Sequence, residues 1–163
     1  MSGPRKTLSG RCNGLGPMGC RVCGALTMQR MRYNCAAESV EMFSTAENLP
    51  VILELPGATI RSAVWNEMAV VHLKLAKGSD FTPILKGLQD DLCQCPHWGY
   101  ILSGSLTIRY KDGREETIRG GDLWHTPPGH TGWCNEDTEY IDFSPAKEFN
   151  HVLAHIKEQL KDA

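Results

Sequence analysis

Apolar and polar residues alternate along most of the chain beyond Leu49, and this two-residue period predicts β-strands. Turn residues separate about eight short strands, an arrangement that is typical of a β-sandwich or a β-barrel. In residues 68–76, for example, the apolar side chains share one face, which we expect to be buried. His72 and Lys74 fall on the other face, and we expect His72 to be solvated there.

The last part of the chain has the period of a helix instead. Ser144 suits the N-cap position and Pro145 the first helical position, so this pair predicts where the helix begins. The apolar residues that follow recur with helical spacing and form one stripe: Phe149, Val152, Leu153, Ile156 and Leu160. The pattern therefore predicts an all-β domain followed by one amphipathic helix.

The N-terminal part of the chain lacks both periods. Residues 1–45 are rich in Gly, Ser and Arg, which predicts a disordered extension ahead of a domain over residues 46–163. An organelle-targeting segment is an alternative, because this stretch bears arginines and almost no acidic residues. A further alternative is translation from upstream of a true start at Met28, Met31 or Met42.

Composition and charge narrow the class of protein. With 163 residues, of which 41% are hydrophobic and 22% charged, we expect one globular domain in the cytoplasm, without a secretory signal or a membrane span. Seven cysteines without a disulfide-framework spacing favour a reducing compartment. Six of the 17 basic residues lie in residues 1–37, which contain no acidic residue. The remainder of the chain therefore contains 11 basic and 19 acidic residues. This acidic body argues against nucleic acid as a partner.

Candidate metal ligands gather in two short motifs. Cys93, Cys95 and His97 occupy every second position, so in a regular strand all three side chains would point to one face. His130 follows a Pro-Pro-Gly corner in the second motif. Two thiols and two imidazoles on one side of a sheet would form a four-ligand site, and their softness and number favour zinc. Residues 77–91 lead directly into the first motif, and we expect this loop to form a lid or a pocket wall.

Other interpretations of these residues remain open. Pro96 weakens the alternation, because a proline inside a strand marks an edge or a bulge, so Cys95 and His97 need not share a face. Both cysteines could also be buried small apolar residues without a metal. Asp91, His97 and His130 form an alternative set with two imidazoles and one carboxylate, which would suit Fe(II). A closed four-ligand site would be structural, whereas a catalytic zinc keeps one coordination position open.

The two motifs also carry a family resemblance. The stretch His97-Trp-Gly-Tyr-Ile-Leu-Ser-Gly104, followed by Gly121 and by Pro127-Pro-Gly129, resembles the two motifs of the cupin superfamily, and in particular small single-domain cupins with C-x-C-P-H-W-G-Y and P-P-G-H signatures. This resemblance implies a jelly-roll barrel with a site in its mouth, and commonly a homodimer. Trp98 and Tyr100 would lie on the face opposite His97, where they would pack the sandwich or a dimer contact instead of lining the site.

The ligand positions depart from the usual cupin pattern. Asp91 and Cys93 stand where the first motif supplies two histidines, and His97 stands where it supplies a glutamate. Gly132 occupies the position of the usual second-motif histidine, two residues after His130. The activities of dioxygenase-type and oxalate-degrading cupins are therefore not expected here. Two function classes follow: a metal-dependent enzyme that acts on a small polar molecule in the barrel mouth, or a non-catalytic cupin module that binds a metal or a ligand as a sensor or store.

Overall fold

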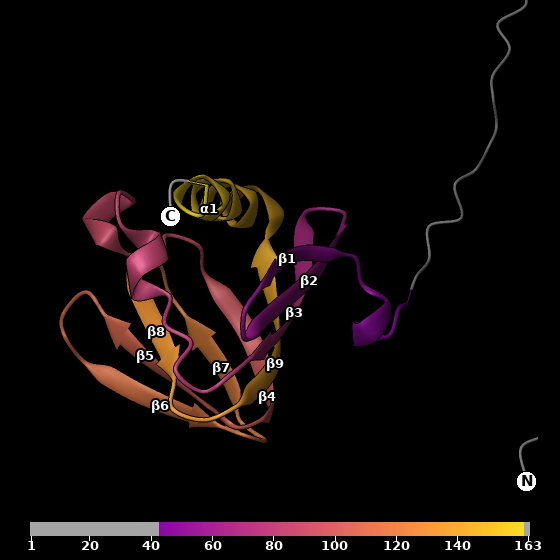
Figure 1. Ribbon diagram of the computed structural model, residues 1–163, viewed down its shortest axis with the longest axis horizontal. Coiled ribbons are helices and arrows are strands. Elements are labelled where there is room, and N and C mark those ends of the chain that lie inside the picture. The colour runs from indigo at the N-terminus through magenta and orange to yellow at the C-terminus, as the bar shows by residue number, and fades with distance from the viewer. Residues whose placement is uncertain (1–42, 162–163) are drawn as a thin grey trace, which may run out of the picture. The chain divides into compact units, whose positions relative to one another are not determined.

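The computed structural model describes residues 43–161 (Figure 1). The predicted N-terminal extension lies almost wholly outside these described residues, and so do the targeting and start-site alternatives. The boundary between extension and domain therefore stays a prediction. Residues 43–45 are exposed and irregular, and the first regular element is the 3-10 helix η1, Ala46–Asn48.

Nine strands form two sheets in the described residues. The larger sheet has the order β1-β2-β3-β9-β4-β7, with these bounds: β1 Val51–Leu55, β2 Ala58–Trp65, β3 Met68–Leu75, β9 Thr138–Pro145, β4 His97–Ser103 and β7 Leu123–Thr126. The smaller sheet has the order β6-β5-β8, with these bounds: β6 Glu115–Arg119, β5 Ser105–Tyr110 and β8 His130–Cys134. Every pairing is antiparallel. The predicted fold class, an all-β cupin-like jelly-roll barrel with a C-terminal helix, is confirmed.

The helices lie at one end of this barrel. Helix α1, Ala146–Gln159, follows β9 directly and lies across one end of the barrel (Figure 1). The segment with the two 3-10 helices lies at the same end: η2, Thr82–Leu85, and η3, Gln89–Asp91. Val152 and Ile156, two members of the predicted apolar stripe, are buried against that segment. No helix in the described part of the chain is both long enough and apolar enough to cross a bilayer.

The core consists of the side chains that the strands direct into the barrel. The inward residues of β3 are buried, and the register places Leu73 opposite Ile60 of β2 and Tyr140 of β9. Ile101 of β4 is fully buried, whereas its neighbour Leu102 is 43% exposed, so successive side chains of one strand lie on opposite faces. The barrel interior is thus filled mainly by aliphatic side chains, which supply the hydrophobic stabilisation of the domain.

Three local predictions were wrong. His72 is only 1% exposed, and its Nε2 atom lies 2.8 Å from a Glu139 carboxylate oxygen. Residues 133–143, for which the alternation predicts one last strand, belong to two strands, since residues 135–137 turn the chain from β8 in one sheet to β9 in the other. Ser144 ends up inside β9 rather than at the N-cap: α1 begins after Pro145 with no side-chain cap, and the Ser144 hydroxyl faces the interior.

Candidate functional site

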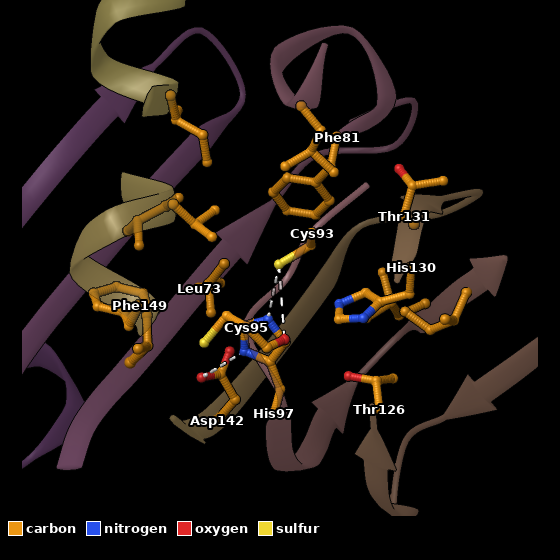
Figure 2. Close-up of a pocket in the computed structure, with 18 of the residues that line it drawn as sticks. Leu73, Phe81, Cys93, Cys95, His97, Thr126, His130, Thr131, Asp142 and Phe149 are labelled. Atoms are coloured by element: carbon orange, nitrogen blue, oxygen red, sulfur yellow. Dashed lines mark hydrogen bonds and ion pairs between the residues drawn. The ribbon is translucent and has the colours of Figure 1, made fainter. Parts of the chain in front are cut away.

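A cavity of about 110 Å³ lies between the two sheets, at the end of the barrel that carries α1 and η2 (Figure 2). This is several times the ~10–15 Å³ that one water molecule needs. Most of the lining side chains are apolar, among them Leu73, Phe81 and Phe149. The polar residues that reach it come from the two sequence motifs and from the end of β9. The cavity can therefore hold a small molecule, and its chemistry is concentrated on one side.

Backbone pairing brings the first two functional side chains together. Cys93 forms an antiparallel bridge with His130, in which Cys93 N–H donates to the His130 carbonyl at 2.7 Å and Gly129 N–H donates to the Cys93 carbonyl at 2.7 Å. Residues that face each other in an antiparallel pair project from the same side. The Cys93 thiol and the His130 imidazole consequently enter the cavity side by side.

The third side chain comes from the other sheet. His97 begins β4 and is paired with Thr126 of β7, and its Nε2 atom lies 3.5 Å from the Cys93 sulfur. The rings of His97 and His130 meet edge to face, with centroids 5.2 Å apart. One ligand atom from each of Cys93, His97 and His130 lies within 4.8 Å of the others. The cluster therefore bridges the two sheets across the barrel.

Hydrogen bonds hold both imidazoles in one orientation. His130 Nδ1 lies 2.7 Å from the Pro127 carbonyl, which can only accept, so Nδ1 is the donor. The Ser144 hydroxyl donates its proton to Asp142 at 3.0 Å, so it must accept from His97 Nδ1 at 2.8 Å. Asp142 itself lies 3.6 Å from His97 Nδ1. Both histidines thus turn Nε2 toward the cluster, in the manner of a metal-binding histidine anchored through its other nitrogen.

The pKa values of Cys93 and His97 differ strongly from their ordinary values. Burial disfavours the Cys93 thiolate, but hydrogen bonds with His130 and His97 outweigh this and lower its pKa to about 6. Burial likewise disfavours the His97 imidazolium, yet the buried Asp142 carboxylate raises the pKa of His97 to about 10. Without a metal, Cys93 and His97 therefore form a thiolate–imidazolium pair near neutral pH.

Two sequence candidates lie outside this cluster. Burial raises the pKa of Cys95 to about 12, its thiol lies 3.4 Å from the Pro96 carbonyl, and Figure 2 shows its sulfur directed toward Phe149 and away from His130. The physical reason is Pro96: residues 93–96 form no regular strand, so the expected alternation of Cys93 and Cys95 does not hold. Asp91 is exposed and accepts the Gly87 N–H at 2.8 Å, so the alternative Fe(II) set is not assembled.

The donor set suits a divalent metal. One thiol that ionises readily and two imidazoles with Nε2 turned toward a common point match the preferences of zinc. Three protein ligands leave one tetrahedral position, and the adjoining cavity would give access to it.

The two residues that orient His97, namely Asp142 and Ser144, were not among the predicted site residues. Asp142 and Ser144 share the inward face of β9 with Tyr140, and all three are buried. A carboxylate on the buried face of an apolar strand is the signal that could have found this pair, because buried charges are rare unless they are partnered.

Comparisons with known proteins give likeness in fold. No family model matches the chain, and no curated protein matches it either. Among solved structures, the chain is similar to an RmlC-like cupin from Shewanella frigidimarina, with 22% identity, a TM-score of 0.49, and coverage of 66% of this chain and 94% of that one. It is also similar to KdgF from Halomonas sp., with 23% identity, a TM-score of 0.49, and coverage of 63% and 92%.

The polyketide cyclase RemF from Streptomyces resistomycificus is a further similar structure, with 17% identity, a TM-score of 0.48, and coverage of 64% of this chain and 78% of that one. The fold of this chain is cupin-like, as its own two-sheet topology shows. Likeness at such identities says nothing about the ligand or the reaction. The chemistry must therefore be inferred from the atoms of the site.

Proposed function

We propose that this protein is a metal-binding cupin-domain protein that holds one divalent metal on Cys93, His97 and His130 and acts on a small molecule in the adjoining cavity. The supporting observation is the convergence of three ligand atoms within 4.8 Å of one another, each oriented by backbone pairing or by a hydrogen bond. Zinc is the proposed metal, and Fe(II) bound to the same three residues is the alternative. The metal would supply Lewis acidity at one end of the cavity.

The side chains around the cluster have separate roles in this proposal. Asp142, through Ser144, fixes the His97 tautomer and compensates positive charge at the cluster. The apolar lining excludes water and receives the body of the ligand. The substrate proposed here thus has an apolar body, which differs from the small polar molecule expected from the sequence.

Elemental analysis of the purified protein tests the metal. We expect about one metal per chain, and loss of most of it in His97→Ala, His130→Ala and Cys93→Ser. Cys95→Ala and Cys134→Ala are the matched controls, since both thiols are buried but lie outside the cluster, and both variants should keep the metal. Acidification should release the metal because ligating thiols must be deprotonated. Wild-type protein without bound metal, after purification with zinc or Fe(II) supplied, would contradict the proposal.

A second candidate function uses the same atoms without a metal. A chain of contacts runs from the Cys93 sulfur through the His97 ring and the Ser144 hydroxyl to the Asp142 carboxylate. This is the arrangement of a thiol nucleophile with an oriented base. Metal content separates the two candidates. Loss of activity on chelation favours the metal, whereas inactivation by a thiol reagent in metal-free, active protein favours the nucleophile.

The outer face of the larger sheet supports a homodimer as part of the same proposal. Trp98, Tyr100, Leu123 and Phe143 are each at least 41% exposed, and the register makes them neighbours on β4, β7 and β9. Contiguous exposed apolar residues of this kind mark an interaction surface. Light scattering should give a dimer for wild-type protein and a monomer for Tyr100→Glu. The cytoplasmic location remains a prediction.

A further inference from the structure

Two buried donors on β7 lack a protein partner. Among the described residues, neither the Trp124 indole Nε1 nor the Thr126 hydroxyl makes a hydrogen bond, and both atoms are buried. The two residues are two positions apart on one strand, so their side chains share a face, and both line the cavity. Native proteins leave few buried polar groups without a partner, so a pair in one cavity requires an explanation.

The position of the indole is fixed by its surroundings. Gly99 of β4 lies directly opposite Trp124, and a β-carbon at Gly99 would collide with the Cε2 and Cζ2 atoms of the indole. Tyr140 packs against the same ring edge to face, at 5.8 Å between centroids. The absence of a side chain at Gly99 therefore makes room for Trp124, and the donor is held rigidly.

The Thr126 side chain lies near His97 and His130 of the cluster (Figure 2). Thr126 is 1% exposed and is the direct register partner of His97. Another threonine of the same cavity, Thr131, has its hydroxyl satisfied by Thr82 at 3.0 Å, so the lack of a partner is specific to Thr126. An indole N–H can only donate, and a hydroxyl can donate as well as accept. The group that complements both is consequently a hydrogen-bond acceptor.

We propose that Trp124 Nε1 and the Thr126 hydroxyl bind the carbonyl-type oxygen of a small molecule whose apolar body fills the cavity. This inference deepens the proposed function and rests on it for the cavity and the adjoining cluster. The oxygen would lie next to His97, and the remainder of the molecule would contact the aliphatic and aromatic side chains toward Phe81 and α1. Trp124 and Thr126 act as specificity-determining residues, because an analogue without the oxygen would leave both donors without a partner.

Binding of three ring compounds to the metal-free and the metal-loaded protein tests this inference. Cyclohexanone offers a neutral acceptor and cyclohexanecarboxylate a charged one, whereas cyclohexane offers none. We expect one of the two oxygen compounds to bind at least about three- to tenfold more tightly than cyclohexane, the factor that one hydrogen bond supplies. The indole N–H resonance of Trp124, assigned by its loss in Trp124→Phe, should shift on binding.

Matched threonine variants separate recognition from structure. Thr126→Val should weaken binding of the oxygen compound about three- to tenfold and leave that of cyclohexane unchanged, while the melting temperature stays the same or rises, because an unpartnered buried hydroxyl is removed. Thr131→Val should instead lower the melting temperature and preserve the discrimination, since its hydroxyl is partnered.

Two results would overturn the inference. One is equal or absent binding of the three compounds; the other is a Thr126→Val variant that loses melting temperature as Thr131→Val does and keeps wild-type discrimination. Metal content is measured in the same samples and should be unchanged in both threonine variants. A metal-loaded protein without discrimination refutes the recognition pair alone, and discrimination in a protein that takes up no metal refutes the metal proposal alone.

Discussion

Replacing Ser144 by alanine removes the link between the proposed metal ligand His97 and the buried Asp142 carboxylate. The hydroxyl is fully buried, accepts from His97 Nδ1 at 2.8 Å and donates to Asp142 at 3.0 Å. Without it, the direct distance of 3.6 Å between His97 Nδ1 and Asp142 is too long for a good hydrogen bond. His97 loses the hydrogen bond that fixes its tautomer and orientation, but no proposed ligand residue is removed.

The expected cost has two parts. Loss of a partner that orients a metal-bound histidine weakens metal affinity about 10- to 100-fold, and each factor of ten corresponds to about 1.4 kcal/mol. Removing a hydrogen bond to a buried carboxylate also lowers the free energy of unfolding of the metal-free protein by about 1.5–3 kcal/mol. The Asp142 side chain is only 6% exposed, so water compensates little of this loss.

A competition titration against a zinc chelator measures the affinity, and denaturant unfolding of the metal-free protein measures the stability. Ser105→Ala is the control, because Ser105 is also buried and its hydroxyl donates to a carboxylate, Glu136, away from the cluster. We expect Ser105→Ala to lose stability and keep wild-type metal affinity. Equal metal affinity of Ser144→Ala and wild-type protein would refute the role given to Ser144, and with it the orientation argument for His97.

Three further predictions concern the core, the indole and the thiol. Ile101→Ala should lower the free energy of unfolding by about 2–5 kcal/mol in a denaturant titration, whereas Leu102→Ala, at the exposed neighbouring position, should cost far less. Gly99→Ala should destabilise by about 1–3 kcal/mol and change the near-ultraviolet dichroism, since the added β-carbon displaces the Trp124 indole. In metal-free protein, thiolate absorbance should show a step with a midpoint at about pH 6, from Cys93, whose ordinary pKa would be 9.0. This step should be missing in Cys93→Ser, and its absence from wild-type protein would contradict the predicted pairing of Cys93 with the histidines.

Local patterns were sufficient for most of the fold. Alternation over residues 68–76 predicted the segment of β3 closely, because this strand has one face in the core. The motif spacing then indicated the jelly roll. The prediction of a solvated His72 was wrong; its partner Glu139 lies on β9, and a local pattern does not contain such a contact between distant segments.

The candidate site was predictable in composition and less so in geometry. His97, His130 and Cys93 were all expected, but the reason that Cys93 lies beside His130 is a backbone bridge between distant segments, not the alternation along one strand. The position of Cys95 outside the cluster follows from the irregular backbone before Pro96. Asp142 was not considered, because its partner is distant in sequence and becomes visible only when β9 pairs with β4.

The positions of His130 and Gly132 on β8 determine where the imidazole lies relative to the cavity. Gly132 stands where the sequence resemblance would place the histidine of the second cupin motif, and it lies two residues after His130 on β8, where both residues line the cavity. A β-carbon at Gly132 would lie 3.0 Å from the Ile108 side chain, so a larger residue there would compete with the barrel core for space. The imidazole of His130 lies at the start of β8, next to the Pro-Pro-Gly corner, where Cys93 is paired with His130. The space beneath, bordered by Gly132 and Ile108, remains part of the cavity. The cavity beside the cluster is lined mainly by apolar side chains, among them Ile108, Phe81 and Phe149, and these would contact the body of the proposed ligand.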